Sequence, residues 1–168
     1  MKHIKNINEN FNSNDLSVKI CDKSKEIYEF ISKYLHVMDF DSYINNENLY
    51  NVCVYDNNIL IATDIFRMKD GKIHLNYSAV DEKYRNKGIN KMMKYFIIDF
   101  AKKNNCTVIT ANVRESNIAS INSFLSTGFT MNTKYDDLKY PDGEKKIPFF
   151  LYLDRFKEKI DKFKNFFK

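Results

Sequence analysis

The most informative part of the chain is the stretch VDEKYRNKGIN, which runs from Val80 to Asn90. An apolar strand ends at Val80, a short basic loop follows, and an amphipathic helix begins after Gly88. The first amides of a helix lack partners within it and lie at the positive end of its dipole, so they suit a phosphate or pyrophosphate. Only four residues of the chain are glycine, and Gly88 stands where backbone and ligand must approach closely. The stretch therefore predicts a site for a nucleotide-type cofactor.

Composition indicates one globular domain. The 168 residues suffice for one core and are too few for two ordinary domains, and 43% of them are hydrophobic. The sequence has no apolar run near ~18 residues and no signal-peptide pattern, so we expect a cytoplasmic protein without a membrane span. Cys21, Cys53 and Cys106 are scattered along the chain, which favours reduced thiols over disulfides or a metal site.

The charge pattern argues against nucleic acid as a partner. The formal net charge is +5, and basic residues are interleaved with Asp and Glu nearly everywhere. A domain that binds nucleic acid concentrates its basic residues in a stripe, whereas this pattern is typical of a solvated surface. We therefore expect the positive charge to attract an anionic cofactor, and we expect no nucleic-acid partner.

Hydrophobic periodicity and turn residues predict an alternating order of strands and helices. We expect strands at residues 16–21, 49–55, 59–68, 72–80, 106–113, 129–135 and 147–153. We expect helices at residues 27–38, 39–46, 89–100 and 117–126, the last of them ended by Gly128. The order β-α-α-β-β-β-α-β-α-β-β predicts a mixed sheet with helices on its faces.

Two local motifs carry a resemblance to a known family. The first is Arg85 to Asn90 after the strand end Ala79-Val80, which matches the pattern Arg/Gln-x-x-Gly-x-Gly/Ala except that Asn90 replaces Gly or Ala. The second matches Asn-x-x-Ala/Ser-x-x-x-Tyr/Phe followed by Gly-Phe, and consists of Asn117, Ser120, Phe124, Gly128 and Phe129. With the order of elements, these motifs resemble the GNAT superfamily of acyl-CoA-dependent N-acetyltransferases over roughly residues 16–153.

The resemblance implies a fold and a domain division. The expected class is α/β with a mixed sheet: three αβα layers around a central, mostly antiparallel sheet of six to seven strands, plus a C-terminal amphipathic helix. Residues 1–14 are expected to form a flexible arm, residues 15–153 the acetyltransferase domain, and residues 154–168 the basic helix. We expect that helix to pack on its own domain or on a second copy in a homodimer, and the alternative is an anionic membrane surface.

The resemblance also implies acetyl-CoA as the cofactor, with its pyrophosphate at the loop amides and its pantetheine arm along the strand end. Asn117 is expected near the start of its helix, and the Phe124 ring beside the thioester. The cofactor-binding residues implied in this way are Ala79, Val80, Arg85, Asn86, Lys87, Gly88, Ile89, Asn90, Asn117, Ser120 and Phe124.

Catalytic roles are less well defined by the sequence. The resemblance implies a backbone N–H near Val80 as the oxyanion donor and a general base eleven residues before Arg85, where His74 stands. Imidazole titrates near neutrality and suits that role, although His74 also fits an ordinary strand residue with a hydrogen-bonded ring. Asn76, two residues later, is a candidate for orienting water or substrate, and Asp64 is a second candidate base.

The general acid is missing from its expected place. Many relatives of this family have a Tyr hydroxyl beside the coenzyme A sulfur, and the matching residue here is Phe124. The other donors we consider are Tyr77, Tyr135 and Tyr140. Because a thiolate is a tolerable leaving group near neutral pH, we expect a slow or substrate-assisted enzyme rather than an inactive one.

These features predict an N-acetyltransferase that moves an acetyl group from acetyl-CoA to a primary amine, on a small molecule or a peptide, by direct attack in a ternary complex. We expect the acceptor between the first two helices, which are rich in aromatic residues, and the loop 135–148. That loop contains carboxylates at Asp136, Asp137, Asp142 and Glu144, and the sequence does not identify the amine. The alternative is a non-catalytic module that binds acyl-CoA or a partner, and a third interpretation is a nucleic-acid- or membrane-associated protein.

Overall fold

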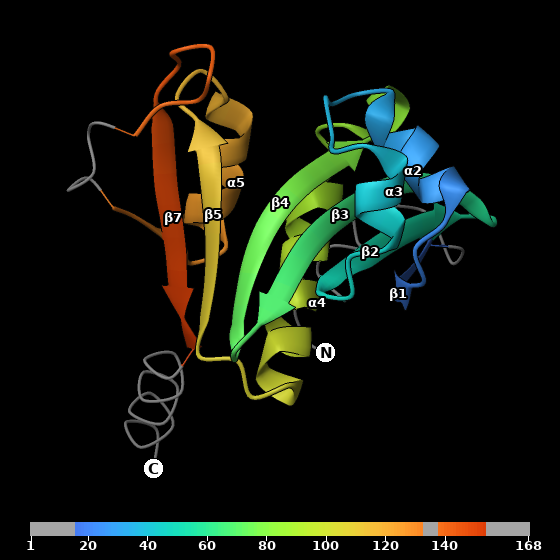
Figure 1. Cartoon of the computed structure of the whole chain (residues 1–168), viewed down its shortest axis with the longest axis horizontal. Helices are drawn as coiled ribbons and strands as arrows, with labels where there is room; N and C mark the ends of the chain where they lie inside the picture. The colour runs from blue at the N-terminus through green and yellow to red at the C-terminus, as the bar shows by residue number, and fades with distance from the viewer. Residues whose placement is uncertain (1–15, 133–137, 154–168) are drawn as a thin grey trace.

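The structure is a computed structural model that describes residues 16–132 and 138–153 (Figure 1). The N-terminal arm expected at residues 1–14 and the C-terminal helix expected at residues 154–168 lie outside the described residues. None of the helices in the described ranges is long and apolar enough to cross a membrane.

A seven-stranded sheet forms the centre of the molecule, with the order β1-β2-β3-β4-β5-β7-β6. All neighbouring strands are antiparallel except β4 and β5, which are parallel. The expected mixed, mostly antiparallel sheet is thereby confirmed. The strands are β1 (Leu16–Cys21), β2 (Leu49–Asp56), β3 (Ile59–Lys69), β4 (Lys72–Val80), β5 (Val108–Arg114), β6 (Thr130–Met131) and β7 (Lys146–Tyr152).

Turn residues set the two hairpins that join β2, β3 and β4. Asn57 and Asn58 both have positive φ, at 48° and 67°, and so do Asp70 and Gly71, at 50° and 68°. Positive φ at both loop positions is the type I′ turn, whose backbone matches the strand twist, and Asn, Asp and Gly tolerate this conformation best. The strand boundaries expected from these turns agree with the structure to within one residue.

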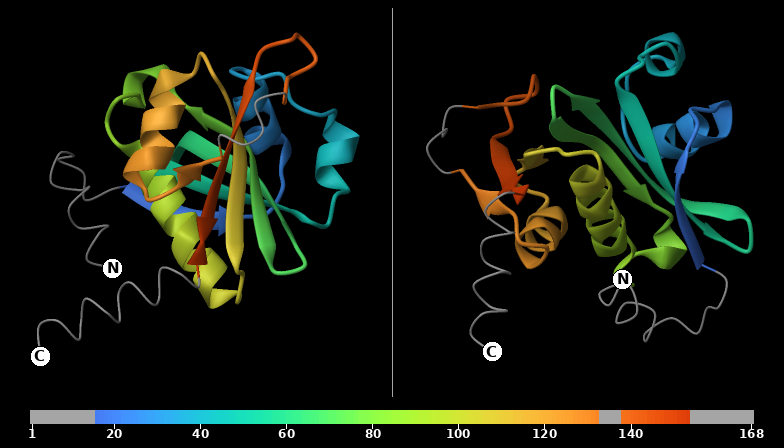
Figure 2. Two further views of the ribbon diagram at one scale, coloured as in Figure 1. Left: turned by 90° about the vertical axis from the view of Figure 1, so that its left-hand side faces the viewer. Right: turned by 90° about the horizontal axis from the view of Figure 1, so that it is seen from below.

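The helices lie on both faces of the sheet: α2 and α3 cover one face, and α4 and α5 cover the other (Figures 1 and 2). Their bounds are α2 (Lys25–Ser32), α3 (Phe40–Ile44), α4 (Ile89–Lys103) and α5 (Ile118–Ser126), with a short 3₁₀ turn η1 (Glu82–Tyr84) before α4. The expected three layers are confirmed. The first helix ends at Ser32 rather than at Met38, and Val37 and Met38 pack on the core from an irregular segment.

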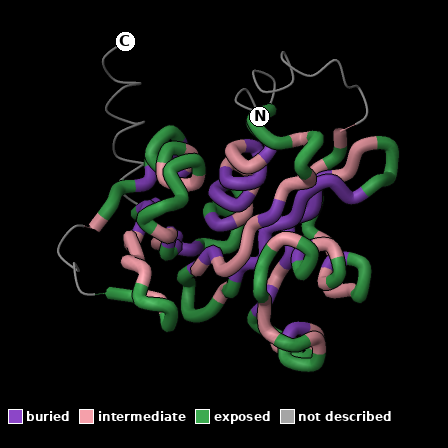
Figure 3. Tube along the Cα trace, turned by 90° about the horizontal axis from the view of Figure 1, so that it is seen from above, coloured by how far each residue is buried: buried purple, intermediate pink, exposed green. Residues whose placement is uncertain are grey.

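Each face of the sheet has its own core, and buried residues follow the strands and the inner side of the helices (Figure 3). Under α4 and α5 the core includes Phe66, Met93, Ile97, Ile109, Phe124 and Phe149. Under α2 and α3 it includes Ile27, Ile31, Tyr43, Leu49, Cys53 and Ile65. Tyr28 and Phe40 pack their rings on Tyr43, so much of the aromatic content of the first helices is core.

The parallel strands β4 and β5 separate halfway along their length (Figure 1). They pair only from Lys72 with Val108 to Leu75 with Ala111. On the β3 side, Ile65 pairs with Tyr77 and Phe66 with Leu75, so Asn76 is the extra residue of a bulge. A bulge bends its strand and increases the local twist, which turns the end of β4 away from β5. The candidate site lies in this opening.

Candidate active site

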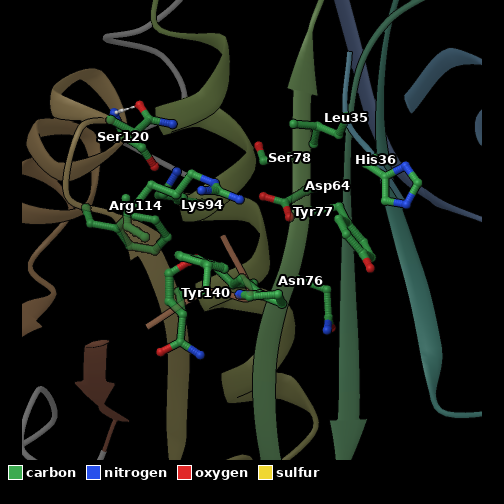
Figure 4. Close-up of a pocket in the computed structure, with 17 residues that line it drawn as sticks. Leu35, His36, Asp64, Asn76, Tyr77, Ser78, Lys94, Arg114, Ser120 and Tyr140 are labelled. Atoms are coloured by element: carbon green, nitrogen blue, oxygen red, sulfur yellow. Dashed lines mark hydrogen bonds between the residues drawn. The ribbon is translucent and has the colours of Figure 1, made fainter. Parts of the chain in front are cut away.

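Two cavities meet at the opening between β4 and β5. The first, which we call the loop cavity, has a volume of about 590 Å³ and lies between the end of β4, the following loop, and the starts of α4 and α5. The second, the strand cavity, has a volume of about 550 Å³ and lies between the separated parts of β4 and β5 (Figure 4). Four residues line both cavities and therefore mark their junction: Leu35, Ser78, Asn117 and Ser120.

Most of the cofactor residues expected from the sequence line the loop cavity. They are Ala79, Val80, Arg85, Asn86, Gly88, Ile89, Asn90, Asn117 and Ser120. Phe124 lines the strand cavity instead. Lys87 is not among the lining residues of either cavity, and its Nζ lies 5.3 Å from the centroid of the Tyr84 ring.

The backbone of β4 directs polar groups into the loop cavity. Val80 pairs with Ala62, and the Asp81 amide donates to the Ile61 carbonyl at 2.8 Å. In an antiparallel ladder this makes Val80 a non-hydrogen-bonded position, so its N–H and C=O point away from β3. By the same alternation the Ser78 amide points that way too. Since β5 has left β4 at this level, these groups face the cavity.

The loop before α4 presents backbone amides in the same direction. The Asp81 carboxylate caps η1 by accepting from the Lys83 amide at 3.0 Å. Gly88 is the N-cap of α4 at φ 79°, and no side chain caps the helix there. The open amides of the first turn and the helix dipole make this end of α4 an anion site. Arg85 lies beside it and donates from Nε to the Val80 carbonyl at 3.2 Å.

Asn90 points inward rather than toward solvent. Its Nδ2 donates to Ser78 Oγ at 2.9 Å, and its Oδ1 accepts from Ser123 Oγ at 3.1 Å and from Lys94 Nζ. Where the family pattern has Gly or Ala, this chain therefore has an amide that joins β4, α4 and α5. That network connects Lys94 of the strand cavity with Asn90 and Ser123 of the loop cavity, beside Ser78, which lines both.

Asp64 is a buried carboxyl in the wall of the strand cavity, with 1% of its surface exposed. Burial raises its pKa, while the charge of Lys94 and a hydrogen bond from Ser78 oppose that rise. Among the described residues, two buried side-chain polar atoms lack a hydrogen-bond partner, Asp64 Oδ1 and Asn76 Oδ1. Both residues line the strand cavity (Figure 4). Buried acceptors without a partner call for an explanation, and a hydrogen-bond donor on a bound ligand or an ordered water supplies one.

Lys94 lies opposite Asp64 and is also 1% exposed (Figure 4). Burial lowers its pKa, and the charge of Asp64 partly restores it. Its Nζ is 4.3 Å from the centroid of the Phe124 ring. The sequence analysis did not single out Lys94. The pattern that could have identified it is a lysine on the apolar face of a helix, followed three and four positions later by Ile97 and Ile98, which are buried.

Phe124 is a buried ring without a hydroxyl group, and it packs against two other aromatic rings. It is 5% exposed, stacks on Phe149 at 5.1 Å and contacts Phe129 edge-on at 4.9 Å. Of the tyrosines considered as donors, Tyr77 and Tyr140 line the strand cavity, and the Tyr140 hydroxyl donates to the Asn112 carbonyl at 3.1 Å. Tyr135 lies outside the described residues.

His74 lies below the point where the strands separate. It pairs with Thr110 on β5, and its Nδ1 is 2.9 Å from Thr110 Oγ1. Burial, with a smaller contribution from Arg67, lowers its pKa. His74 is not among the residues that line either cavity, whereas Asn76 lines the strand cavity. The catalytic role predicted for His74 stays a prediction.

Ion pairs of Arg114 stabilise the outer wall of the strand cavity. Arg114 lies 2.6 Å from Asp142 and 2.5 Å from Glu144. The contact with Arg114 lowers the pKa of Asp142, and a hydrogen bond from the Ser116 hydroxyl, followed by the contact with Arg114, lowers the pKa of Glu144. Glu144 also accepts from the Ser116 amide at 3.1 Å. The two carboxylates expected to attract a cationic acceptor are therefore engaged with Arg114, and Asp136 and Asp137 lie outside the described residues.

Comparison with known proteins places this geometry in a family. The profile of the Acetyltransferase (GNAT) family matches residues 18–129. The chain belongs to the GNAT family. The resemblance drawn from the two motifs is thereby confirmed, and membership supports acyl-CoA-dependent acetyl transfer as the general activity. No curated protein sequence matches the chain.

Solved structures of GNAT acetyltransferases share the fold. The ribosomal-protein-S18-alanine N-acetyltransferase of Escherichia coli is 21% identical with a TM-score of 0.68, over 82% of this chain and 94% of that protein. A Bacillus subtilis acetyltransferase in complex with CoA is 16% identical with a TM-score of 0.65, over 82% and 98%. A chimeric spermidine N-acetyltransferase from Vibrio cholerae is 10% identical with a TM-score of 0.70, over 86% and 99%. At these identities the likeness concerns the fold.

Proposed function

We propose that this GNAT protein transfers an acetyl group from acetyl-CoA to a primary amine by direct attack in a ternary complex. The observation that carries the proposal is the junction of the two cavities. One cavity offers backbone amides and a helix N-terminus to an anion, and the other contains a buried carboxyl with an unpaired oxygen. A thioester held at the junction is accessible from both sides.

The loop cavity suits the cofactor. The amides at the start of α4 would bind the pyrophosphate, with Arg85 adding positive charge. The Ser78 and Val80 backbone groups would bind the pantetheine arm as an additional strand does. The Val80 amide, predicted as the oxyanion donor, lines the loop cavity, and the Ser78 amide on the same side of β4 lies at the junction. A preorganised backbone donor at either position would act most strongly where charge develops on the acetyl carbonyl. Asn117 and Ser120 close the junction from α5.

The strand cavity suits the amine. A buried polar atom without a partner costs about 1–3 kcal/mol, and Asp64 Oδ1 and Asn76 Oδ1 are both in that state. A primary amine in this cavity would bring an N–H donor to the Asp64 carboxyl. Attack requires a neutral nitrogen that later loses a proton, and Asp64 is the carboxyl that lines this cavity close to the junction (Figure 4). We assign it the role of proton acceptor.

Phe124 favours a second candidate function, a module that binds acyl-CoA without catalysis. Phe124 has no proton to give to the leaving thiolate, which is the feature we would expect in a module that binds acyl-CoA without catalysis. The buried carboxyl favours the enzyme, since a cofactor-binding module has no use for an unpaired acceptor beside the thioester.

Thiol release separates the two functions. Wild-type protein with acetyl-CoA is mixed with a panel of polyamines, aminoglycosides and N-terminal peptides, and free coenzyme A is measured with a thiol reagent. We expect release above the rate without protein for at least one class of primary amine, and the acetylated product in equal amount by mass spectrometry. Binding of coenzyme A without release for any of these amines would favour the non-catalytic module.

The contribution of His74 is testable in the same assay. His74→Gln is expected to change kcat by less than about threefold, which is under 1 kcal/mol of barrier, because the ring contacts Thr110 and lies outside both cavity linings. The comparison is the pH profile of kcat/KM for wild type and variant. A loss of tenfold or more together with a shifted acid limb would assign the base to His74.

A further inference from the structure

Lys94 is a buried cation that the proposed reaction has not yet used. It is 1% exposed and belongs to the apolar face of α4, where a lysine carries a large desolvation cost unless it has partners. Its partners are the Asn90 amide oxygen, the charge of Asp64 and the face of the Phe124 ring. Because burying an ammonium group has this desolvation cost, we expect Lys94 to have a function.

The position of Lys94 points to the sulfur of the cofactor. Lys94 lines the strand cavity, and Asn90, to which it donates, lines the loop cavity. The hydrogen bond between these two side chains therefore links the two cavities beside Ser78, which lines both, close to where the thioester must sit for the amine to reach it. Its Nζ is 4.3 Å from the centroid of the Phe124 ring, the residue that stands where relatives have a hydroxyl. An ammonium has three donors, and Asn90 takes one of them.

We propose that Lys94 gives the proton to the coenzyme A thiolate and takes the place of the hydroxyl that Phe124 lacks. This inference rests on the proposed function. The amine nitrogen forms a bond to the acetyl carbon, the carbon–sulfur bond breaks, and its electron pair goes to sulfur. Sulfur receives a proton from Lys94 Nζ, and the nitrogen of the new amide gives a proton to Asp64. The proton then returns from Asp64 to Lys94 through water, so the pair starts the next turnover unchanged.

Among the described charged groups around Lys94, Asp64 is the one whose charge acts directly on it. The charged and titratable groups that line the strand cavity with Lys94 are Asp64 from β3, Tyr77 from β4, Arg114 from β5, His36 and Tyr140. Arg114 is paired with Asp142 and Glu144, whereas the charge of Asp64 acts directly on Lys94. Burial lowers the pKa of Lys94 toward the working range, where an ammonium transfers its proton more readily than at its ordinary value.

Three variants test the proposal: Lys94→Met, Phe124→Tyr and the double variant. Methionine keeps the volume and removes the proton, and we expect kcat to fall about 100-fold, with coenzyme A affinity within about twofold by titration. The alkaline limb of the kcat profile should disappear, since that limb reports loss of the Lys94 proton. The double variant should regain at least about tenfold and show a new alkaline limb near the tyrosine pKa of ~10.

Each outcome decides. Lys94→Met with kcat within about threefold of wild type overturns the proposal. A loss with an unchanged alkaline limb, or a loss that Phe124→Tyr does not recover, assigns Lys94 a positioning role and also overturns it. Removing one member of a buried charge pair is expected to destabilise the fold, because Asp64 then loses the charge of Lys94. Thermal unfolding of each variant therefore identifies the temperatures at which it is folded, and rates are compared only there. Failure of wild type to bind coenzyme A would instead contradict the proposed function.

Discussion

Asp64→Asn is expected to lower kcat for amine acetylation by about 100- to 1000-fold. An amide has nearly the shape of the carboxyl and fits the same buried position, but it cannot take up a proton. Asp64 Oδ1 is unpaired and lies in the wall of the strand cavity, so the change removes the acceptor that would receive the amine proton. Coenzyme A affinity should stay within about threefold, because Asp64 does not line the loop cavity.

Asp99→Asn is the matched control for this experiment. Asp99 is an exposed carboxylate on α4, outside both cavity linings. Steady-state rates with the best amine, coenzyme A titration and thermal unfolding should be measured for both variants. If Asp64→Asn retains more than about a tenth of the wild-type kcat while its fold is intact, Asp64 is not the proton acceptor.

The pH dependence of activity is expected to follow from the buried pair Asp64 and Lys94. Burial raises the pKa of Asp64 above its ordinary value, so activity should rise with pH as this carboxyl loses its proton. Burial lowers the pKa of Lys94 below its ordinary value, so activity should fall again at a pH below that at which a free lysine titrates. The two limbs belong to the coupled pair and not to either residue alone. In Asp64→Asn the alkaline limb should move to lower pH, because Lys94 loses the charge that holds its proton.

Ser120→Glu is expected to weaken coenzyme A binding by about 10- to 100-fold. Ser120 lies in the first turn of α5 and lines both cavities, so the longer, charged side chain obstructs the path of the pantetheine arm and adds negative charge beside an anionic ligand. A loss of this size corresponds to about 1.4 to 2.7 kcal/mol. The fold should be kept, since glutamate in the first turn of a helix is favourable.

Ile118→Glu is the control with the same added charge on the same helical turn. Ile118 is 60% exposed and is not among the residues that line either cavity. Its variant should bind coenzyme A within about twofold of wild type at moderate salt. Equal weakening by the two variants would mean that net charge, and not the junction at Ser120, controls binding, and it would argue against the assignment of the loop cavity.

The sequence was sufficient where the chemistry is local. The loop from Arg85 to Gly88 and the cap at Asn117 depend on residues within one or two turns of each other, and their backbone conformations follow from those residues. The hairpins at Asn57-Asn58 and Asp70-Gly71 are local in the same sense. Together with the strand order, these features predicted the family, and most of the cofactor residues predicted from them line the loop cavity.

The sequence was insufficient where the site depends on residues far apart in the chain. Asp64 on β3 and Lys94 on α4 are brought together only by the packing of the helix on the sheet, and each alone resembles an ordinary charged residue. The inward direction of the Asn90 side chain depends on Ser78 and Ser123, which lie on other elements. Counting along β4 to His74 also crosses the bulge at Asn76, where the alternation of side chains is interrupted.

The central claim is that the loop cavity binds coenzyme A. Calorimetric titration of the wild-type protein with coenzyme A at moderate ionic strength tests it most directly. The account predicts saturable binding of one coenzyme A per chain that Ser120→Glu weakens and that Asp64→Asn and Ile118→Glu leave nearly unchanged. No binding at millimolar coenzyme A, or binding that is equal in all four proteins, would contradict it.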